Sequence, residues 1–231
     1  MKSIFSSKTI DALSIDCLIF GFMKSELFIL LIKHKTGPTK NTWKLPGGWI
    51  QYNEDLDEAA RRILKIQTGV NNLFLEQFKT FGNVNRFPND RVITIAYYAL
   101  LNAENFELPL APVDIQVSWV RISEIPDMLY DHNKIFRSCL AFIKHKVQHE
   151  PIGFNLLPKK FTLKQLQDLY EAILQQKLDK SNFRKKLLKM NLLIKTDEKQ
   201  KDVSHRAAML YTFDKKVYHL LQESGFTFEL N

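Results

Sequence analysis

Four carboxylates lie close together in a segment that is predicted to form a helix after a Gly-Gly turn at residues 47–48. They are Glu54, Asp55, Asp57 and Glu58. Carboxylate oxygens are the ligands that a hard cation such as Mg²⁺ prefers. All four, however, fall in the predicted first turn, where the helix dipole also favours anions. Capping and dipole stabilisation are therefore the favoured interpretation, and metal binding is the alternative.

The helix that carries these residues is bounded by local signals. Asn53 is predicted to be its N-cap, because the side-chain oxygen can accept hydrogen bonds from free N–H groups of the first turn. Gly69 is predicted to end it as a left-handed cap. Further along, three positions spaced three and four apart share one helix face, and they hold Ile63, Ile66 and Gln67.

The spacing resembles the signature of the Nudix family, in which a Gly, five residues, a Glu and seven residues precede Arg-Glu-apolar-x-Glu-Glu-x-Gly-apolar. The matching residues are Gly48, Glu54, Arg62, Leu64, Gly69 and Val70. Three carboxylates hold the metal in that family, and Ile63, Ile66 and Gln67 take their places here. Two apolar side chains and a neutral amide cannot replace three anionic ligands. The resemblance therefore implies a Nudix frame that has no catalytic residues, metal or cofactor, and the protein is predicted not to be an enzyme.

Composition sets the wider bounds. The chain has 231 residues and is 45% hydrophobic, which is enough for one large domain or two ordinary ones. Cys17 and Cys139 lie in apolar runs and are predicted to be reduced core residues. No apolar run reaches the roughly 18 residues of a membrane span, and no signal peptide is visible at the N-terminus. These features predict a cytoplasmic protein without membrane contact.

The first part of the chain is predicted to mix strands with two helices. Apolar runs predict a β-hairpin at 14–22 and 26–35 and further strands at 73–81, 91–101 and 115–121. A turn of helix is expected at 123–126, and a long helix at 131–148 capped by Asp131. The Nudix resemblance implies an α/β/α sandwich over about residues 14–149. A boundary is placed in the Pro-containing segment that starts at residue 151, which gives an effector-sensing domain at 1–150 and a second domain at 151–231.

The second domain is predicted to be a winged helix-turn-helix, so that the fold class is α+β. Thr162 caps a helix that runs to about residue 175, and Asp179 caps a second helix at 180–191. Strands at 192–196 and 208–213 flank a charged tip at 197–206, and a last helix spans about 214–223. In this arrangement the second helix enters the major groove of DNA.

The exposed face of that second helix is strongly basic. Residues 151–231 hold 15 of the 33 basic and 9 of the 25 acidic side chains, and the whole chain has a net charge of +8. Asn182 can pair with adenine, and Arg184 with guanine or a phosphate. The predicted DNA-binding residues are Lys180, Ser181, Asn182, Arg184, Lys185, Lys186, Lys189, Lys201, His205 and Arg206, and Lys199 belongs to the same wing. The alternative is a protein-interaction domain whose lysines are merely solvated.

A Nudix-like domain followed by a winged helix resembles the Nudix-related transcriptional regulators, which include repressors of NAD metabolism and the arabinose-responsive regulators of Bacteroides. The most specific segments are 151–158, 161–174 and 178–186, and the resemblance covers nearly the whole chain. It implies a homodimer that binds a palindromic operator in double-stranded DNA and responds to a small-molecule effector. The arabinose-responsive branch also has a degraded Nudix box, so the expected effector is a sugar such as arabinose or a related carbohydrate metabolite.

The effector pocket is predicted from aromatic and charged residues near the Nudix box. The candidate ligand-binding residues are Trp43, Lys44, Trp49, Glu54, Arg86 and Tyr98. Plain core packing is the alternative for the aromatic residues, and Arg86 could instead pair with Glu54 or Asp90. The loop at 82–91 resembles a segment of ADP-ribose-type Nudix proteins, with Phe87 where an Asp would stand. The histidines show no metal-ligand spacing and are expected to be packed or solvated.

Three functions remain open from the sequence. The favoured one is a ligand-responsive transcriptional regulator with an inert Nudix domain. The second is an active Nudix hydrolase of ADP-ribose or a similar nucleoside diphosphate. The third is a protein-interaction adaptor without DNA binding or catalysis.

Overall fold

The computed structural model describes residues 12–88, 90–104, 106–201 and 207–223. Contacts divide the chain into two compact units. The first unit comprises Met1–Phe20, Phe28–Ala99 and Glu107–Cys139, and the second comprises Gly21–Leu27, Leu100–Phe106 and Leu140–Asn231. Among the helices of the described residues, none has the length and apolar character that a membrane crossing requires.

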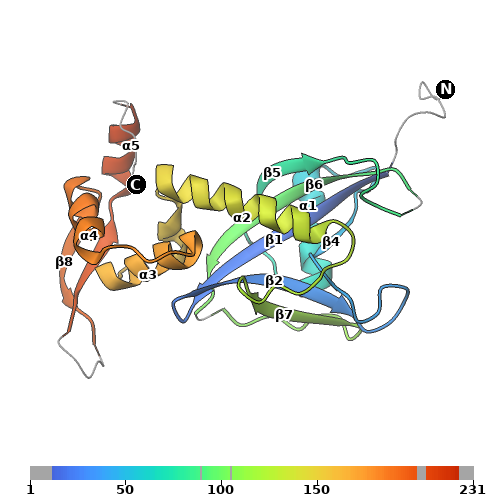
Figure 1. Ribbon diagram of the computed structural model, residues 1–231, viewed down its shortest axis with the longest axis horizontal. Coiled ribbons are helices and arrows are strands. Elements are labelled where there is room, and N and C mark those ends of the chain that lie inside the picture. Colours follow the sequence, from blue (N-terminus) through green and yellow to red (C-terminus); the bar gives the residue numbers. More distant parts are fainter. Residues whose placement is uncertain (1–11, 89, 105, 202–206, 224–231) are drawn as a thin grey trace. The chain divides into compact units, whose positions relative to one another are not determined.

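A seven-stranded sheet forms the frame of the first unit (Figure 1). Its strands are β1 (Ala12–Met23), β2 (Glu26–His34), β3 (Trp43–Lys44), β4 (Gly47–Trp49), β5 (Glu76–Phe81), β6 (Val92–Asn102) and β7 (Ile115–Arg121). The order is β3-β2-β1-β6-β5, with β4 paired to β1 and β7 to β2. The pairs β1–β4, β2–β7 and β5–β6 are antiparallel.

Helices cover the two faces of this sheet, because successive side chains of a strand point to opposite sides. On one face, the Sγ of Cys17 lies 3.9 Å from the carbonyl oxygen of Ala60 in α1 (Leu56–Thr68). On the other, Phe20 stacks on Phe136 of α2 (His132–His149), with ring centroids 6.2 Å apart. In Figure 1 the first half of α2 crosses in front of the strands and α1 lies behind them. The predicted α/β/α sandwich is confirmed.

The two cysteines are buried and free, as predicted. Burial raises the pKa of both thiols, so Cys17 and Cys139 are protonated core residues.

The start of α1 differs from the prediction. Asp55 is the N-cap, and Glu58 closes a capping box by accepting the Asp55 backbone N–H at 3.1 Å. The prediction that Asn53 caps this helix was therefore wrong by two residues. Gly69 does end the helix in the left-handed conformation, with φ +75° and its N–H donated to the carbonyl oxygen of Lys65.

Two other boundaries differ from the sequence prediction. The segment at 123–126 is a turn and not a helix, and strand β5 begins at Glu76 rather than near residue 73. The carboxylate of Asp131, which was expected to cap α2, accepts hydrogen bonds from Arg86.

The second unit contains the predicted winged helix-turn-helix. Its elements are η1 (Ile152–Leu156), α3 (Leu163–Leu174), α4 (Lys180–Lys189), β8 (Leu193–Lys199), β9 (Met209–Phe213) and α5 (Lys215–Glu223). Thr162 caps α3 by accepting the Gln165 N–H, and Asp179 caps α4 by accepting the Asn182 N–H at 2.8 Å. Strand β8 extends to Lys199, so the start of the predicted charged tip belongs to a strand.

Candidate functional site

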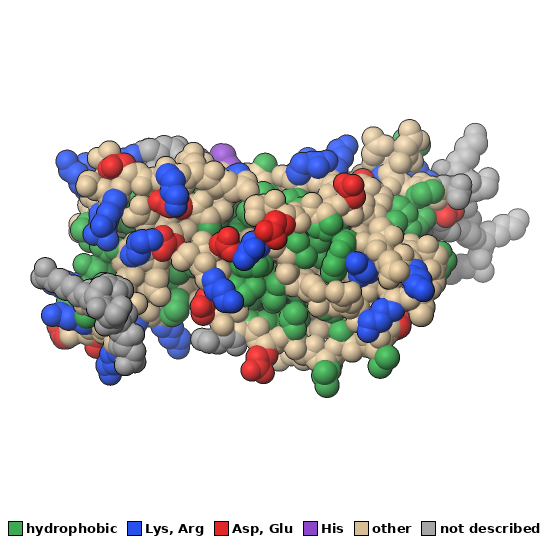
Figure 2. Space-filling view, turned by 60° about the horizontal axis from the view of Figure 1, so that its bottom comes forward, with side chains coloured by type: hydrophobic (Ala, Val, Ile, Leu, Met, Phe, Trp, Pro, Cys, Tyr) green, Lys and Arg blue, Asp and Glu red, His purple; other side chains and the backbone are tan. Residues whose placement is uncertain are grey.

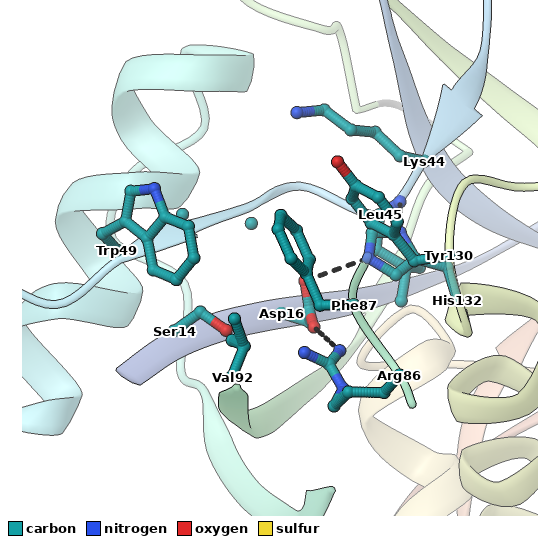
Figure 3. A pocket seen from close by; sticks show the side chains of 12 residues that line it. Ser14, Asp16, Lys44, Leu45, Trp49, Arg86, Phe87, Val92, Tyr130 and His132 are labelled. Atoms are coloured by element: carbon teal, nitrogen blue, oxygen red, sulfur yellow. Dashed lines mark hydrogen bonds and ion pairs between the residues drawn. The ribbon is translucent and has the colours of Figure 1, made fainter. Parts of the chain in front are cut away.

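A cavity of about 200 Å³ opens in the first unit between β1, β3 and the segments that precede α2. Figure 3 shows its side chains, with Trp49 on one side, Tyr130 and His132 on the other, and Asp16 and Arg86 at the base. These residues lie far apart in the sequence, and the sheet brings them together.

The base of the cavity is a buried ionic network centred on Arg86, whose side chain is 3% exposed. The Nε and Nη2 of Arg86 donate to the two carboxylate oxygens of Asp131 at 3.1 and 2.9 Å. Nη2 also lies 3.4 Å from Oδ2 of Asp16, which accepts the Thr94 hydroxyl at 2.8 Å. The alternative that Arg86 pairs with Glu54 or Asp90 was therefore wrong. Because the guanidinium of Arg86 is already paired with both carboxylates, its role is to stabilise the cavity. Little of its positive charge is available to a ligand.

His132 completes this network in its neutral form. The backbone N–H of Leu45 donates to Nδ1 at 3.0 Å, so Nδ1 carries no proton, and Nε2 lies 3.5 Å from Oδ1 of Asp16. Burial lowers the pKa of His132, and the nearby Asp16 and Asp131 oppose that shift only in part. The cavity therefore presents an uncharged imidazole at neutral pH.

The rim of the cavity is aromatic and carries one cation. Trp49 is 53% exposed and meets Phe87 edge to face, with ring centroids 6.0 Å apart. The ring centroids of Phe87 and Tyr130 are 4.5 Å apart. Burial lowers the pKa of Lys44, which lines the same cavity and has no ion pair within the described part of the chain. Flat aromatic faces beside a lysine suit a ligand that has both a ring and an anionic group.

The α1 positions where the Nudix family carries carboxylates have other roles here. Ile63 is 3% exposed and packs beneath Gly48, whereas Ile66 is 56% exposed. The amide of Gln67 accepts the Gly47 N–H and donates to the Gly47 carbonyl, both at 2.8 Å. Within the described ranges, no group of three or more His, Cys, Asp or Glu side chains is placed to hold a metal ion.

The predicted ligand-binding residues separate into two sets. Lys44, Trp49 and Arg86 line the cavity together. The other three lie outside its lining: Trp43 stacks under the Lys33 ammonium at 4.3 Å, Tyr98 is buried in β6, and Glu54 is paired with Arg62. The hydrogen bond from Arg62 lowers the pKa of Glu54 to about 2.

Several lining residues were not predicted from the sequence, namely Ser14, Asp16, Phe87, Tyr130 and His132. One of them had a sequence signal, since Asp16 is the lone carboxylate in the apolar run of β1. A charge in a strand that is buried on both faces needs a partner.

The predicted DNA-binding residues lie in the second unit, mostly on the surface of α4. The exposed ones are Lys180, Ser181, Asn182, Lys185, Lys186, Lys189 and Lys201. Arg184 is only half-exposed, and His205 and Arg206 lie outside the described residues. On the face drawn in Figure 2, Lys and Arg side chains are scattered over the surface with Asp and Glu among them, and do not form one unbroken patch.

Comparisons with known proteins cover both units. The protein-family model of the NUDIX domain matches residues 11–139. The family model of the NrtR DNA-binding winged helix domain matches residues 153–213. The chain is 31% identical over 210 residues to the "ADPR responsive transcriptional repressor NtrR" of Acinetobacter baylyi, covering 89% of this chain and 83% of that protein. This chain belongs to the NrtR family of Nudix-related transcriptional regulators. The match to the regulator family that the sequence predicted is thereby confirmed.

A solved NrtR structure agrees with this assignment, and a hydrolase is similar to about half of the chain. The crystal structure of Shewanella oneidensis NrtR aligns with a TM-score of 0.71 and 27% identity, covering 87% of this chain and 94% of that chain. The ADP-ribose pyrophosphatase of Methanocaldococcus jannaschii is 28% identical over 122 residues, which is 53% of this chain and 71% of that protein.

Proposed function

We propose that this protein is a DNA-binding transcriptional repressor whose Nudix-like unit binds ADP-ribose without hydrolysing it. The observation that carries the proposal is the α1 face, where Ile63, Ile66 and Gln67 stand in place of three carboxylates and Gln67 is fully engaged with Gly47. A face of this kind offers Mg²⁺ no anionic oxygen. The similarity to a repressor named as ADPR-responsive, which extends over both units, supports the same reading.

The chemistry of the cavity fits ADP-ribose. The exposed indole of Trp49 provides a stacking surface for adenine, and the Lys44 ammonium is available to a phosphate. The Ser14 hydroxyl lines the same cavity and supplies a hydrogen bond for a ribose hydroxyl. No comparison supports the free sugar, such as arabinose, that the sequence resemblance favoured. ADP-ribose is proposed in its place.

The DNA-binding role is assigned to α4 and the wing. The exposed lysines of α4 supply phosphate contacts, and Asn182 reaches a base edge in the major groove. A homodimer, a palindromic operator, a functional boundary after residue 150 and a cytoplasmic location remain predictions.

The effector assignment is tested by calorimetric titration with ADP-ribose, arabinose and ribose in the presence of EDTA. We expect ADP-ribose to bind and both free sugars to fail. Trp49→Ala should weaken ADP-ribose binding by about 1–3 kcal/mol, the usual value of a base stacked on an aromatic ring. Tyr52→Ala is the matched control, because Tyr52 is a fully exposed aromatic residue outside the cavity lining. Binding of arabinose but not of ADP-ribose would reinstate the sugar effector.

The regulatory assignment is tested by mobility shift with DNA from upstream of its own gene, with and without ADP-ribose. We expect specific binding that ADP-ribose changes, because an effector with different affinities for two states shifts their populations. No specific DNA binding in either state would contradict the proposal. Turnover of ADP-ribose that requires Mg²⁺ would favour the hydrolase alternative.

A further inference from the structure

A second hollow, of about 430 Å³, lies in the second unit and is distinct from the effector cavity. It is lined by the start of α3 at Thr162 and Lys164, by Arg184 of α4, and by Lys199 and Tyr211 of the wing strands. Figure 1 shows α3, α4 and β8 close together at this end of the chain. Three basic side chains from three separate elements therefore face one space.

Contacts within the described residues do not account for the guanidinium of Arg184. Its Nε is buried and has no hydrogen-bond partner, and the described residues offer its guanidinium no acidic partner. A buried donor without a partner destabilises the folded chain. The next two residues, Lys185 and Lys186, are exposed on the helix surface, so only Arg184 turns toward the hollow.

Two acidic side chains of the elements that line the hollow, one in α3 and one in β8, are already paired. Asp168 accepts the ammonium of Lys164, and Glu198 accepts that of Lys160 at 2.5 Å. In the part of the chain that the structure describes, Lys199 has no ion pair. Among the described residues, Arg184 and Lys199 therefore have no paired counter-charge at this site.

We propose that this hollow, which we call the Arg184 pocket, binds one backbone phosphate of the DNA. This inference rests on the proposed DNA-binding function and gives Arg184 a role that differs from reading a base. A guanidinium matches a phosphate with two parallel N–H donors, and Arg184 is the α4 residue that lines the hollow. In helix-turn-helix proteins the first helix crosses the DNA backbone, and here that is α3, whose N-terminal end lines the pocket.

The position of Arg184 sets what it contributes to recognition. A phosphate contact fixes the register and orientation of the protein on the duplex but carries no sequence information. Removing Arg184 should therefore weaken binding by a similar factor on specific and unrelated DNA. Base reading is left to exposed side chains of α4 such as Asn182.

The test uses full-length protein and a duplex that the wild type has selected from random sequences. Single methylphosphonate linkages, which remove one phosphate charge each, are placed along its backbone. At one linkage in each half-site, we expect the wild type to lose roughly 10- to 100-fold in affinity, the range of a charge-assisted hydrogen bond. Arg184→Ala should bind the unmodified duplex that much more weakly, reduce the salt dependence by about one phosphate, and lose nothing more at that linkage.

Lys185→Ala is the matched control, because Lys185 is an exposed cation of α4 that does not line the pocket. It should keep the full loss at that linkage. Like Arg184→Ala, Lys199→Ala should lose no further affinity at that linkage. It is the variant to use if Arg184→Ala fails to fold.

Two outcomes would overturn the inference. In the first, Arg184→Ala loses nothing more when 7-deazaguanine replaces one guanine, but still shows the full loss of affinity at every methylphosphonate linkage. Arg184 would then read a base, and the repressor assignment would stand. A wild-type protein that selects no DNA would overturn both the inference and the proposed function.

Discussion

Replacing Arg86 by methionine should destabilise the first unit severely, because it leaves two buried carboxylates without their cation. The side chains of Asp16 and Asp131 are 7% and 15% exposed, and Arg86 approaches them at 3.4 and 2.9 Å. At an effective dielectric constant of about 20, each such approach is worth roughly 5 kcal/mol before desolvation is subtracted. Breaking a buried pair by removing one partner typically costs about 3–5 kcal/mol.

Thermal unfolding followed by circular dichroism measures this loss. In a chain of this size, 1 kcal/mol corresponds to about 2–4 °C, so the melting temperature of Arg86→Met should fall by roughly 6–20 °C. Arg137→Met is the matched control, since Arg137 is an exposed arginine of α2, and it should stay within about 0.5 kcal/mol of wild type.

A double-mutant cycle with Asp16→Asn separates the ionic term from lost packing. Neutralising Asp16 removes one of the stranded charges, so the double variant should be more stable than the sum of the two single losses predicts. A loss below about 1 kcal/mol for Arg86→Met, or strict additivity with Asp16→Asn, would refute the idea that this network holds the cavity together.

Three further changes test separate parts of the structure. Folding lowers the pKa of His132 from its usual 6.5, so the unfolded chain binds the proton more readily. The stability of the folded protein should therefore fall as the pH drops below about 6.5. His132→Gln should make the melting temperature less dependent on pH in that range. Gln67→Ala removes two hydrogen bonds to Gly47 and should cost about 1–3 kcal/mol in urea unfolding, whereas Ile66→Ala, on the exposed side of the same helix, should cost less than about 0.5 kcal/mol. Thr162→Ala removes the cap of α3 and should lower the free energy of unfolding by about 1 kcal/mol, and an unchanged midpoint would show that the cap is dispensable.

Much of the fold could be predicted because its signals are local. Thr162, Asp179 and Gly69 bound their helices through contacts within a few residues, so the sequence alone placed them correctly. The error at α1 was also local. Asn53 and Asp55 are both good N-caps, and Glu58 at the third position of the helix decides for Asp55 by closing the capping box.

The sequence by itself determined the two-part architecture, the basic second unit and the loss of carboxylates at positions 63, 66 and 67, since these depend only on residue type and spacing. Only the tertiary structure decided which residues form the cavity. Asp16, Arg86 and Asp131 are separated by tens of residues, and the pairing of β1 with its neighbours and the placement of α2 bring their charges together. The half-buried position of Arg184 also follows from packing, because helical periodicity gives the direction of a side chain but not the wing strands that enclose it.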